Sequence, residues 1–204
     1  MKTYAASVRP PTLIERKQES VREAIGASAS RLFREKGFHA ATIDDIAKAA
    51  GIGRRTFFRY FETKEDVVLW KFDQFARHVV TLITARPARE PSLVALQRAL
   101  TEASEFYNQE PAEALALLKL TEATPSLYAQ QLLQQDRWKG WFAEALRKRT
   151  RASARSVLPE LVAAVGLEAT AIAVRRWVNA PGSDLSDQIA GCFAGLRKVL
   201  VVKP

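Results

Sequence analysis

The sequence contains few cysteines and histidines, two residue types that often bind metal ions or act in catalysis. It contains one cysteine, Cys192, and two histidines, His39 and His78, among 204 residues. A single thiol excludes an intrachain disulfide and a cysteine-rich zinc site, and neither histidine belongs to an H-E-x-x-H pattern. Cys192 lies on an apolar stripe, which is typical of a small buried residue. We therefore expect no metal site.

Two common patterns of enzymes are also missing. Gly51-Ile52-Gly53 lacks the remaining glycines and the preceding strand of a dinucleotide-binding fingerprint. The sequence contains no nucleophile elbow, the glycine-flanked serine turn of many hydrolases. These absences predict a protein that is not an enzyme and that needs no cofactor.

Long apolar runs are absent as well. No stretch approaches the roughly 18 uncharged apolar residues that a membrane helix requires. Residues 1–16 contain no continuous apolar core of a secretion signal. Together with the lone cysteine, these observations predict a cytoplasmic protein that does not enter a membrane.

Positive charges outnumber negative charges, and the excess is unevenly distributed along the sequence. Lys and Arg number 31 against 22 Asp and Glu, a net charge of +9. Residues 1–64 have a net charge of +6, whereas the much longer remainder has a net charge of +3. Such an excess often signals an anionic partner. We expect that partner to bind the N-terminal third.

The spacing of apolar residues predicts an all-α protein of about nine helices, because apolar positions recur at helical spacing and no segment alternates like a strand. Pro and Gly separate the predicted helices. These helices span residues 15–36, 43–50, 54–60, 64–85, 92–109, 111–123, 126–151, 159–179 and 184–202. Residues 1–14 form either a disordered tail or an arm that carries Lys2 and Arg9 to DNA.

Residues 42–61 contain the signals of two short helices joined by a tight turn. Thr42 is a predicted N-cap, with Asp45 completing a capping box. Gly51 suits the left-handed position that ends a helix, and Gly53 can cap the next one. Phe57 and Phe61 then lie four residues apart on one face. On residues 54–60 the opposite face is cationic, which favours a helix-turn-helix that reads DNA.

A longer motif carries a resemblance to a known family. The segment from Thr42 to Glu65 reads Thr-Ile-x-x-Ile-Ala-x-x-Ala-Gly-Ile-x-x-x-Thr-Phe-Phe-x-Tyr-Phe-x-x-Lys-Glu. It resembles the N-terminal signature of the TetR/AcrR family of bacterial transcriptional regulators. The resemblance implies a three-helix DNA-binding domain at residues 1–66 and a helical domain for effector binding and dimerisation at residues 67–204.

The residues predicted to contact DNA fall into two groups. Arg forks match the O6 and N7 of guanine, and threonine methyl or phenylalanine ring groups match the thymine methyl. The resemblance implies phosphate contacts at three further positions, and Phe58 stands where the family usually has Tyr. The base-reading candidates are Arg54, Arg55, Thr56 and Phe58; the phosphate candidates are Thr42, Tyr60 and Lys64; and Arg59 suits either role. Alternatively, the arginines only solvate an exposed helix face.

The resemblance also implies a dimer formed by the last two helices of each protomer. Small residues that permit close helix approach accompany larger anchors there. The predicted interface residues are Leu161, Val165, Ala169, Ile172, Ile189, Phe193 and Leu196. The same stripe can instead form a core within one chain.

A pocket for an unknown small-molecule effector is expected in the C-terminal domain. Its candidate lining is mostly aromatic, although aromatic stripes usually just pack in a core. The candidates are Phe72, Phe75, Phe106, Leu118, Glu122, Trp138, Trp141, Phe142 and Trp177. Glu122 is either a buried polar selector or a solvated helix-end residue. The basic run from Arg147 to Arg151, with Arg155, either holds a phosphorylated or acyl-coenzyme A effector or solvates a helix end.

The sequence thus predicts a homodimeric regulator that binds a double-stranded, pseudo-palindromic operator. We expect a repressor that leaves DNA when a largely apolar effector binds, with residues 64–85 linking the DNA reader to the effector pocket. Two alternatives are an activator of the same architecture and a helical ligand-binding protein without sequence-specific DNA recognition.

Overall fold

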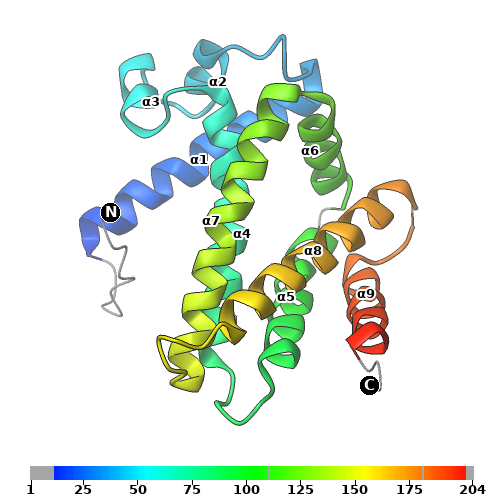
Figure 1. Ribbon diagram of the computed structural model, residues 1–204. Helices are drawn as coiled ribbons and strands as arrows, with labels where there is room; N and C mark the ends of the chain where they lie inside the picture. Colours follow the sequence, from blue (N-terminus) through cyan, green and yellow to red (C-terminus); the bar gives the residue numbers. More distant parts are fainter. Residues whose placement is uncertain (1–11, 110, 181, 201–204) are drawn as a thin grey trace. The chain divides into compact units, whose positions relative to one another are not determined.

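The structure is a computed structural model that describes residues 12–109, 111–180 and 182–200. Within these residues the chain forms nine α-helices and no β-strand (Figure 1). The prediction of an all-α protein is confirmed. The helices are α1 Leu13–Lys36, α2 Ile43–Ala49, α3 Arg54–Tyr60, α4 Lys64–Ala85, α5 Ser92–Gln109, α6 Pro111–Ala123, α7 Pro125–Thr150, α8 Leu158–Asn179 and α9 Leu185–Leu200.

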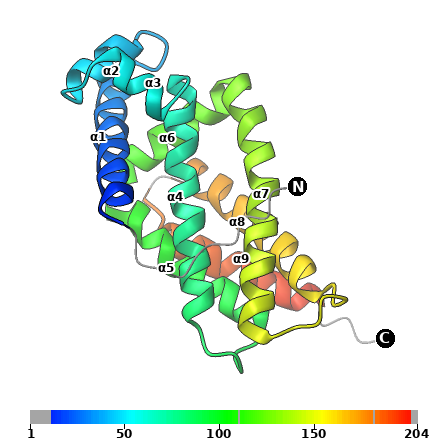
Figure 2. The ribbon, with the colours of Figure 1, turned by 90° about the vertical axis from the view of Figure 1, so that its left-hand side faces the viewer.

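The chain divides into two compact units, Met1–Val67 and Val68–Pro204, and the division falls inside α4. We call them the N-terminal unit and the C-terminal unit. In the N-terminal unit α2 contacts α1, and α3 contacts α2 (Figures 1 and 2). In the C-terminal unit α8 contacts α5, α7 and α9. Each unit therefore has a helical core of its own.

The first helix starts earlier than the sequence pattern predicted. Thr12 is its N-cap, and a complete capping box joins Thr12 to Glu15: each side chain accepts a hydrogen bond from the other residue's backbone N–H. Such a box satisfies N–H groups that a helix start leaves unpaired. An irregular arm as far as residue 14 was therefore wrong for Leu13 and Ile14, which are helical. Lys2 and Arg9 lie outside the described residues.

The predicted turn between α2 and α3 is confirmed. Gly51 has a φ of 68°, in the left-handed region where a side chain would be strained. Its N–H donates to Lys48 O, and the N–H of Ile52 donates to Ala47 O, so the last carbonyls of α2 are satisfied. The chain then starts α3 at once, with Gly53 as an N-cap that has no side chain to contribute.

The core of the C-terminal unit depends on one close helix contact. A methyl group placed on Gly166 of α8 would lie 2.4 Å from Leu96 Cδ2, a side-chain atom of α5, and 3.5 Å from a ring carbon of Phe193 in α9. Real carbon atoms do not approach at the first of these distances. Only glycine therefore lets α8 lie this close to α5 without displacing Leu96.

A buried arginine links the end of α7 to the connection between α4 and α5. The guanidinium of Arg149 donates to Pro87 O at 2.6 Å, to Glu90 O at 2.9 Å and to Ser92 Oγ at 3.3 Å. Its side chain is buried, and this desolvation lowers its pKa, while the charge of Glu90 acts in the opposite direction. Arg149 thus adds donors to two backbone carbonyls of the α4–α5 connection, of which Pro87 O also accepts from Glu90 N–H at 3.0 Å.

Replacing Arg149 by Met is expected to reduce the free energy of unfolding by about 1–3 kcal/mol, because it removes a charged donor from at least two partly buried carbonyls. Urea denaturation measures this change. Lys148→Met, which alters an exposed neighbour on the same helix, serves as the control and should change the stability little. Equal effects of the two variants would contradict the role given to Arg149.

Candidate nucleic-acid interface

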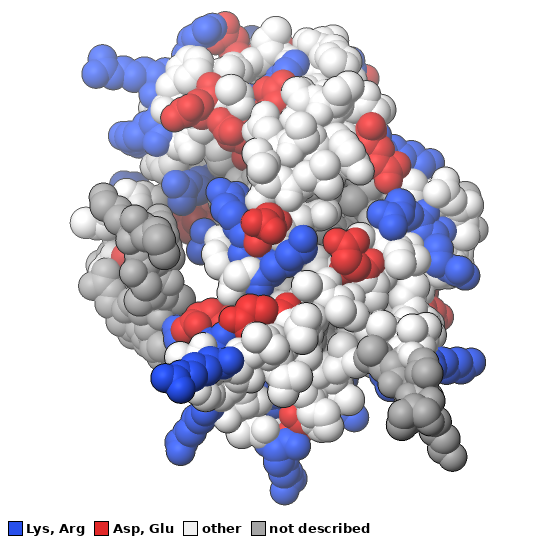
Figure 3. Space-filling view, in the orientation of Figure 1, with Lys and Arg blue, Asp and Glu red and all other residues white. Residues whose placement is uncertain are grey.

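The orientation of α3 is set by two aromatic side chains. Phe57 is fully buried and Phe61 is 5% exposed, so one side of α3 faces the core of the N-terminal unit. The predicted outward face of this helix is confirmed. We call it the α3 outer face, and it consists of Arg54, Arg55, Phe58 and Arg59, all of which are exposed. In Figure 3, Lys and Arg side chains project at the upper left, over the region that α3 occupies in Figure 1.

The two arginines at the start of α3 differ in their surroundings. Arg54 Nη1 donates to Asp44 Oδ2 of α2 at 2.6 Å, and the Arg54 guanidinium carbon lies 5.4 Å from the centre of the Phe58 ring. Arg55 is exposed and has no hydrogen-bond or ion-pair partner within the part of the chain that the structure describes. Arg55 is therefore free to meet a ligand, whereas Arg54 is already held in a defined position.

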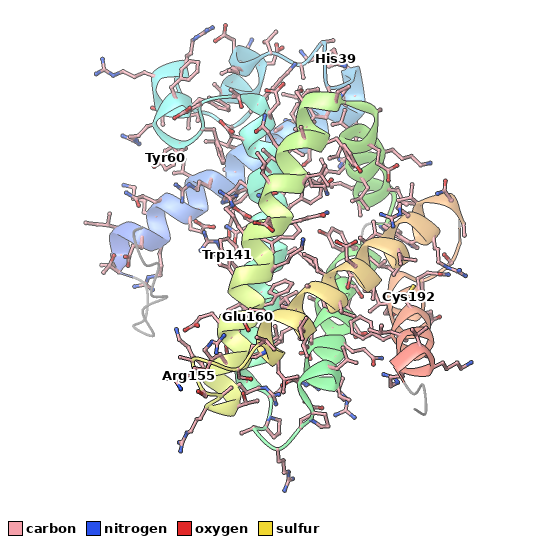
Figure 4. All side chains as sticks on the ribbon, in the orientation of Figure 1. His39, Tyr60, Trp141, Arg155, Glu160 and Cys192 are labelled. Atoms are coloured by element: carbon pink, nitrogen blue, oxygen red, sulfur yellow. The ribbon has the colours of Figure 1, made fainter. Side chains whose placement is uncertain are left out.

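Tyr60 ends α3 between two arginine side chains. Its hydroxyl accepts a hydrogen bond from Arg59 Nη2 at 3.3 Å, and the guanidinium carbons of Arg59 and Arg22 lie 5.1 Å and 6.0 Å from its ring centre. Figure 4 labels Tyr60 at this end of the helix. Because the hydroxyl acts as an acceptor here, its own hydrogen is still available to a phosphate oxygen.

Thr42 is used as the cap of α2. Its hydroxyl accepts from Asp45 N–H at 3.1 Å and donates to Asp45 Oδ2 at 2.6 Å, while Lys36 Nζ donates to the same oxygen at 2.5 Å. These bonds to Lys36 and Thr42 lower the pKa of Asp45 well below its usual range. The predicted capping box is confirmed. The Thr42 hydroxyl hydrogen is engaged within it, so a phosphate contact through that group must break the bond to Asp45.

The structure gives Lys64 a different role from the predicted phosphate contact. Its ammonium donates to three backbone carbonyls, Phe38 O at 2.6 Å, Ala41 O at 3.1 Å and His39 O at 3.3 Å. It also lies 4.5 Å from the centre of the Phe38 ring. An ammonium has three donors. All three are directed at the α1–α2 loop, so Lys64 fastens that loop to the first turn of α4.

The residues predicted to line a pocket differ in how deeply they are buried in the C-terminal unit, and their role as a lining stays a prediction. Phe72, Phe142, Trp138 and Trp177 are buried. Phe75, Leu118 and Trp141 are partly buried, and the Phe106 side chain lies outside what the structure describes. Glu122 is exposed at the end of α6, so the alternative of a solvated helix-end residue is confirmed and that of a buried polar selector was wrong.

Two polar residues that were not predicted from the sequence, Asp73 and Gln134, connect α4 to α7. Trp138 Nε1 donates to Asp73 Oδ1 at 2.7 Å, and Gln134 Nε2 donates to Leu69 O at 2.7 Å. Gln134 is 3% exposed, and its Oε1 has no hydrogen-bond partner within the described residues. Polar positions inside an apolar helix pattern give little signal in a sequence. Only the structure therefore shows that Gln134 Oε1 is a buried hydrogen-bond acceptor.

Two arginines of the basic run at the end of α7 are engaged within the chain. Arg147 donates to Ser153 O at 2.8 Å and pairs with Glu160, which Figure 4 labels at the start of α8. Arg149 is the buried residue described above. The last turn of α7 carries Arg147, Lys148 and Arg149, as expected of a basic helix end, but Arg147 and Arg149 are not solvated there. Both donate to oxygen atoms of neighbouring connections instead, and their expected role in holding a phosphorylated or acyl-coenzyme A effector stays a prediction.

The residues predicted to form a dimer interface separate into two groups. Leu161 and Ile172 of α8 are 54% and 46% exposed. Val165 and Leu196 are partly exposed. Ile189, Phe193 and Ala169 are buried inside this chain, so their assignment to a dimer surface was wrong. Cys192 is partly exposed rather than buried.

Two expected absences concern the described residues alone. None of their helices combines the length and the apolar character that a bilayer crossing requires. Their His, Cys, Asp and Glu side chains form no group of three or more that could hold a metal ion.

Comparisons with known proteins match both units. Residues 25–69 match the family model of bacterial regulatory proteins, tetR family, and residues 90–201 match the model of the MftR C-terminal domain. The chain is 28% identical to the transcriptional regulator TcmR of Streptomyces glaucescens, over 86% of this chain and 80% of TcmR. It is 26% identical to the putative mycofactocin biosynthesis transcriptional regulator MftR of Mycobacterium tuberculosis, over 91% of this chain and 96% of MftR.

A solved structure shares the fold. The chain superposes on Thermus thermophilus FadR, a TetR-family transcriptional repressor in complex with lauroyl-CoA, with a TM-score of 0.55. The sequences are 23% identical, and the match covers 90% of this chain and 96% of FadR. This likeness extends the shared helical architecture to the C-terminal unit.

Lys64→Met is expected to destabilise the N-terminal unit by about 1–3 kcal/mol, because three loop carbonyls lose their common donor. Thermal unfolding followed by circular dichroism measures the loss. Lys48→Met, at an exposed position in the last turn of α2, removes the same charge as a control. An unchanged unfolding temperature, together with a smaller salt dependence of DNA binding, would favour the phosphate contact instead.

Proposed function

The chain belongs to the tetR family of bacterial regulatory proteins, and from this premise we propose that it acts as a homodimeric repressor with a pseudo-palindromic operator. We further propose that a small, largely apolar effector releases it from DNA. The observation that carries the proposal is the α3 outer face, three arginines and a phenylalanine exposed on a helix whose opposite side is buried.

Base reading is assigned to the start of α3. In a helix-turn-helix the N-terminal residues of the second helix contact base edges in the major groove. Arg54 and Arg55 occupy those positions, and each guanidinium can donate two bonds to one guanine. Thr56 and Phe58 offer methyl and ring groups to thymine. This arrangement supports an operator half-site with at least one guanine next to an A·T pair.

Phosphate contacts are assigned to the end of α3. Arg59 and Tyr60 lie side by side there, and the Tyr60 hydroxyl can donate while Arg59 supplies charge. Such contacts position the helix without reading sequence. Thr42 can add a phosphate contact at the start of α2, at the cost of its bond to Asp45.

The dimer is assigned to the exposed faces of α8 and α9. Leu158, Leu161 and Ile172 place large apolar side chains on the surface of α8. Methyl groups added to Gly191 and Gly195 of α9 would meet nothing within 4 Å, so this side of α9 is open. Large side chains beside open small positions suit the close packing of a second copy. The α3 helices of the two protomers would then meet operator half-sites about 34–36 Å apart.

The effector site is assigned to the region between α4 and α7. Phe72 of α4 and Trp138 and Phe142 of α7 are buried. The buried oxygen of Gln134 on α7 has no hydrogen-bond partner within the described residues, so it can accept a hydrogen bond from a ligand. The part of α4 that belongs to the C-terminal unit supplies Leu69 and Asp73 to this region, while the first turn of α4 belongs to the N-terminal unit. An effector that prefers one position of α4 would shift the population between DNA-binding and free states.

This function places the protein in the bacterial cytoplasm, where its operator is, and requires no catalytic step. Selection of bound sites from random DNA tests the proposal, since a dimeric reader should enrich a pseudo-palindrome. Repeating the selection with lauroyl-CoA, the ligand in the FadR structure, probes release by an acyl effector. Failure to enrich any sequence would overturn DNA recognition. If the protein raises transcription when it is bound at the enriched site, it is an activator and not a repressor.

Arg54→Ala and Arg55→Ala are each expected to cost about 1–3 kcal/mol of binding at one operator position and to relax the base preference there. Competition binding with single-base operator variants measures this effect. Lys17→Ala, which removes an exposed charge from α1, is the control and should leave every base preference unchanged. Equal losses on all DNA sequences would argue against base reading.

Replacing both Leu161 and Ile172 by Glu is expected to convert the dimer to a monomer, because two buried carboxylates per protomer would lose their hydration without a partner. Sedimentation velocity measures the mass. Leu133→Glu, at a position on α7 that is 72% exposed, should leave the dimer intact. A double variant that remains dimeric would move the interface away from α8.

A further inference from the structure

We propose that Asp44 of α2 is a specificity-determining residue that holds Arg54 in position for base reading and keeps it from nonspecific phosphate contacts. Asp44 lies in the first turn of α2 and is not among the residues assigned above to DNA binding. The inference rests on the proposed function of the α3 outer face.

The Arg54 guanidinium is contacted from two directions. Asp44 Oδ2 accepts a hydrogen bond from Nη1 at 2.6 Å, and the Phe58 ring, one turn further along α3, lies 5.4 Å from the guanidinium carbon. One contact comes from each helix of the helix-turn-helix. A long arginine side chain is flexible, so two simultaneous contacts restrict it to few conformations.

The ion pair between Arg54 and Asp44 can orient the Arg54 side chain, but it contributes little to the stability of the fold. The side chains of Arg54 and Asp44 are 61% and 60% exposed. Exposed ion pairs add little to stability because water screens them. Only one of the five N–H donors of Arg54 is used by Asp44, so the rest of the guanidinium can still make a two-bond contact with guanine.

The carboxylate also opposes nonspecific binding. A phosphate that approaches Arg54 must compete with Asp44, and a negative charge on this surface repels the DNA backbone. A guanine edge uses the remaining donors of Arg54 and need not displace Asp44. The pair therefore penalises backbone contact more than base contact, and this difference is what creates specificity.

Asp44→Asn tests the inference because asparagine has the shape of aspartate without its charge. We expect the base preference at the position read by Arg54 to fall by about threefold or more, a part of the roughly 5- to 150-fold that an arginine contact provides. Binding to DNA without an operator should become tighter. Asp44→Glu, which restores the charge, should recover part of the preference.

Two controls separate this effect from a change of net charge or of folding. Glu62→Gln removes a charge from an exposed residue of the same unit, and should tighten all binding without altering base preference. In an Arg54→Ala background, Asp44→Asn should no longer change the preference, because the residue it positions is gone. Thermal unfolding should be the same for all variants.

Two results would overturn the inference. Asp44→Asn could leave the base preference unchanged, as Glu62→Gln does, while the wild type remains selective, or its effect on base preference could persist without Arg54. Each would show that Asp44 does not act through Arg54. Absence of selectivity in the wild type itself would instead refute the proposed function, so the two failures are distinguishable.

Discussion

A helix of seven residues is too short to be stable in water by itself, and both α2 and α3 have this length. Contacts with the rest of the N-terminal unit must therefore hold the helix that is proposed to read DNA. Phe57 is the side chain of α3 with no exposed surface, and Ile46 is its counterpart in α2. Burial of Phe57 decides which side of α3 faces outward. Every role proposed for the arginines of this helix depends on that one constraint.

Some charged groups in the N-terminal unit make contacts within the chain that stabilise the fold and that limit their availability to DNA. Lys64 is directed at three loop carbonyls, and Lys36 is paired with Asp45, the capping-box partner of Thr42. Neither is freely available to a phosphate, although both add to the net charge of the unit. On α3, the positive charges that can act locally on DNA are those of Arg55 and of Arg59 beside Tyr60. Net charge attracts the polyanion, while the few unengaged cations determine where it binds.

Much of the fold was predictable because its signals are local. Capping by Thr42, the left-handed Gly51 and the apolar spacing of Phe57 and Phe61 each depend on residues within a turn or two. The role of Lys64 was not predictable, since an ammonium can satisfy a phosphate or a carbonyl and only the path of the α1–α2 loop decides which. Arg149 was missed for the same reason: its partners lie about 60 residues away. A sequence pattern identifies a donor but not its distant acceptor.

The last two helices show why an apolar stripe cannot identify a dimer surface by itself. Ile189 and Phe193 have no exposed surface, because α9 uses that side against α5 and α8. Gly166 serves this internal contact, whereas Gly191 and Gly195 lie on the open side of α9. Small residues of α8 and α9 therefore occur both on the face that packs inside this chain and on the face that is open. The side left exposed, with Leu161 and Ile172 on α8, still has apolar surface to bury, and in the proposed dimer a second copy of the same face would cover it.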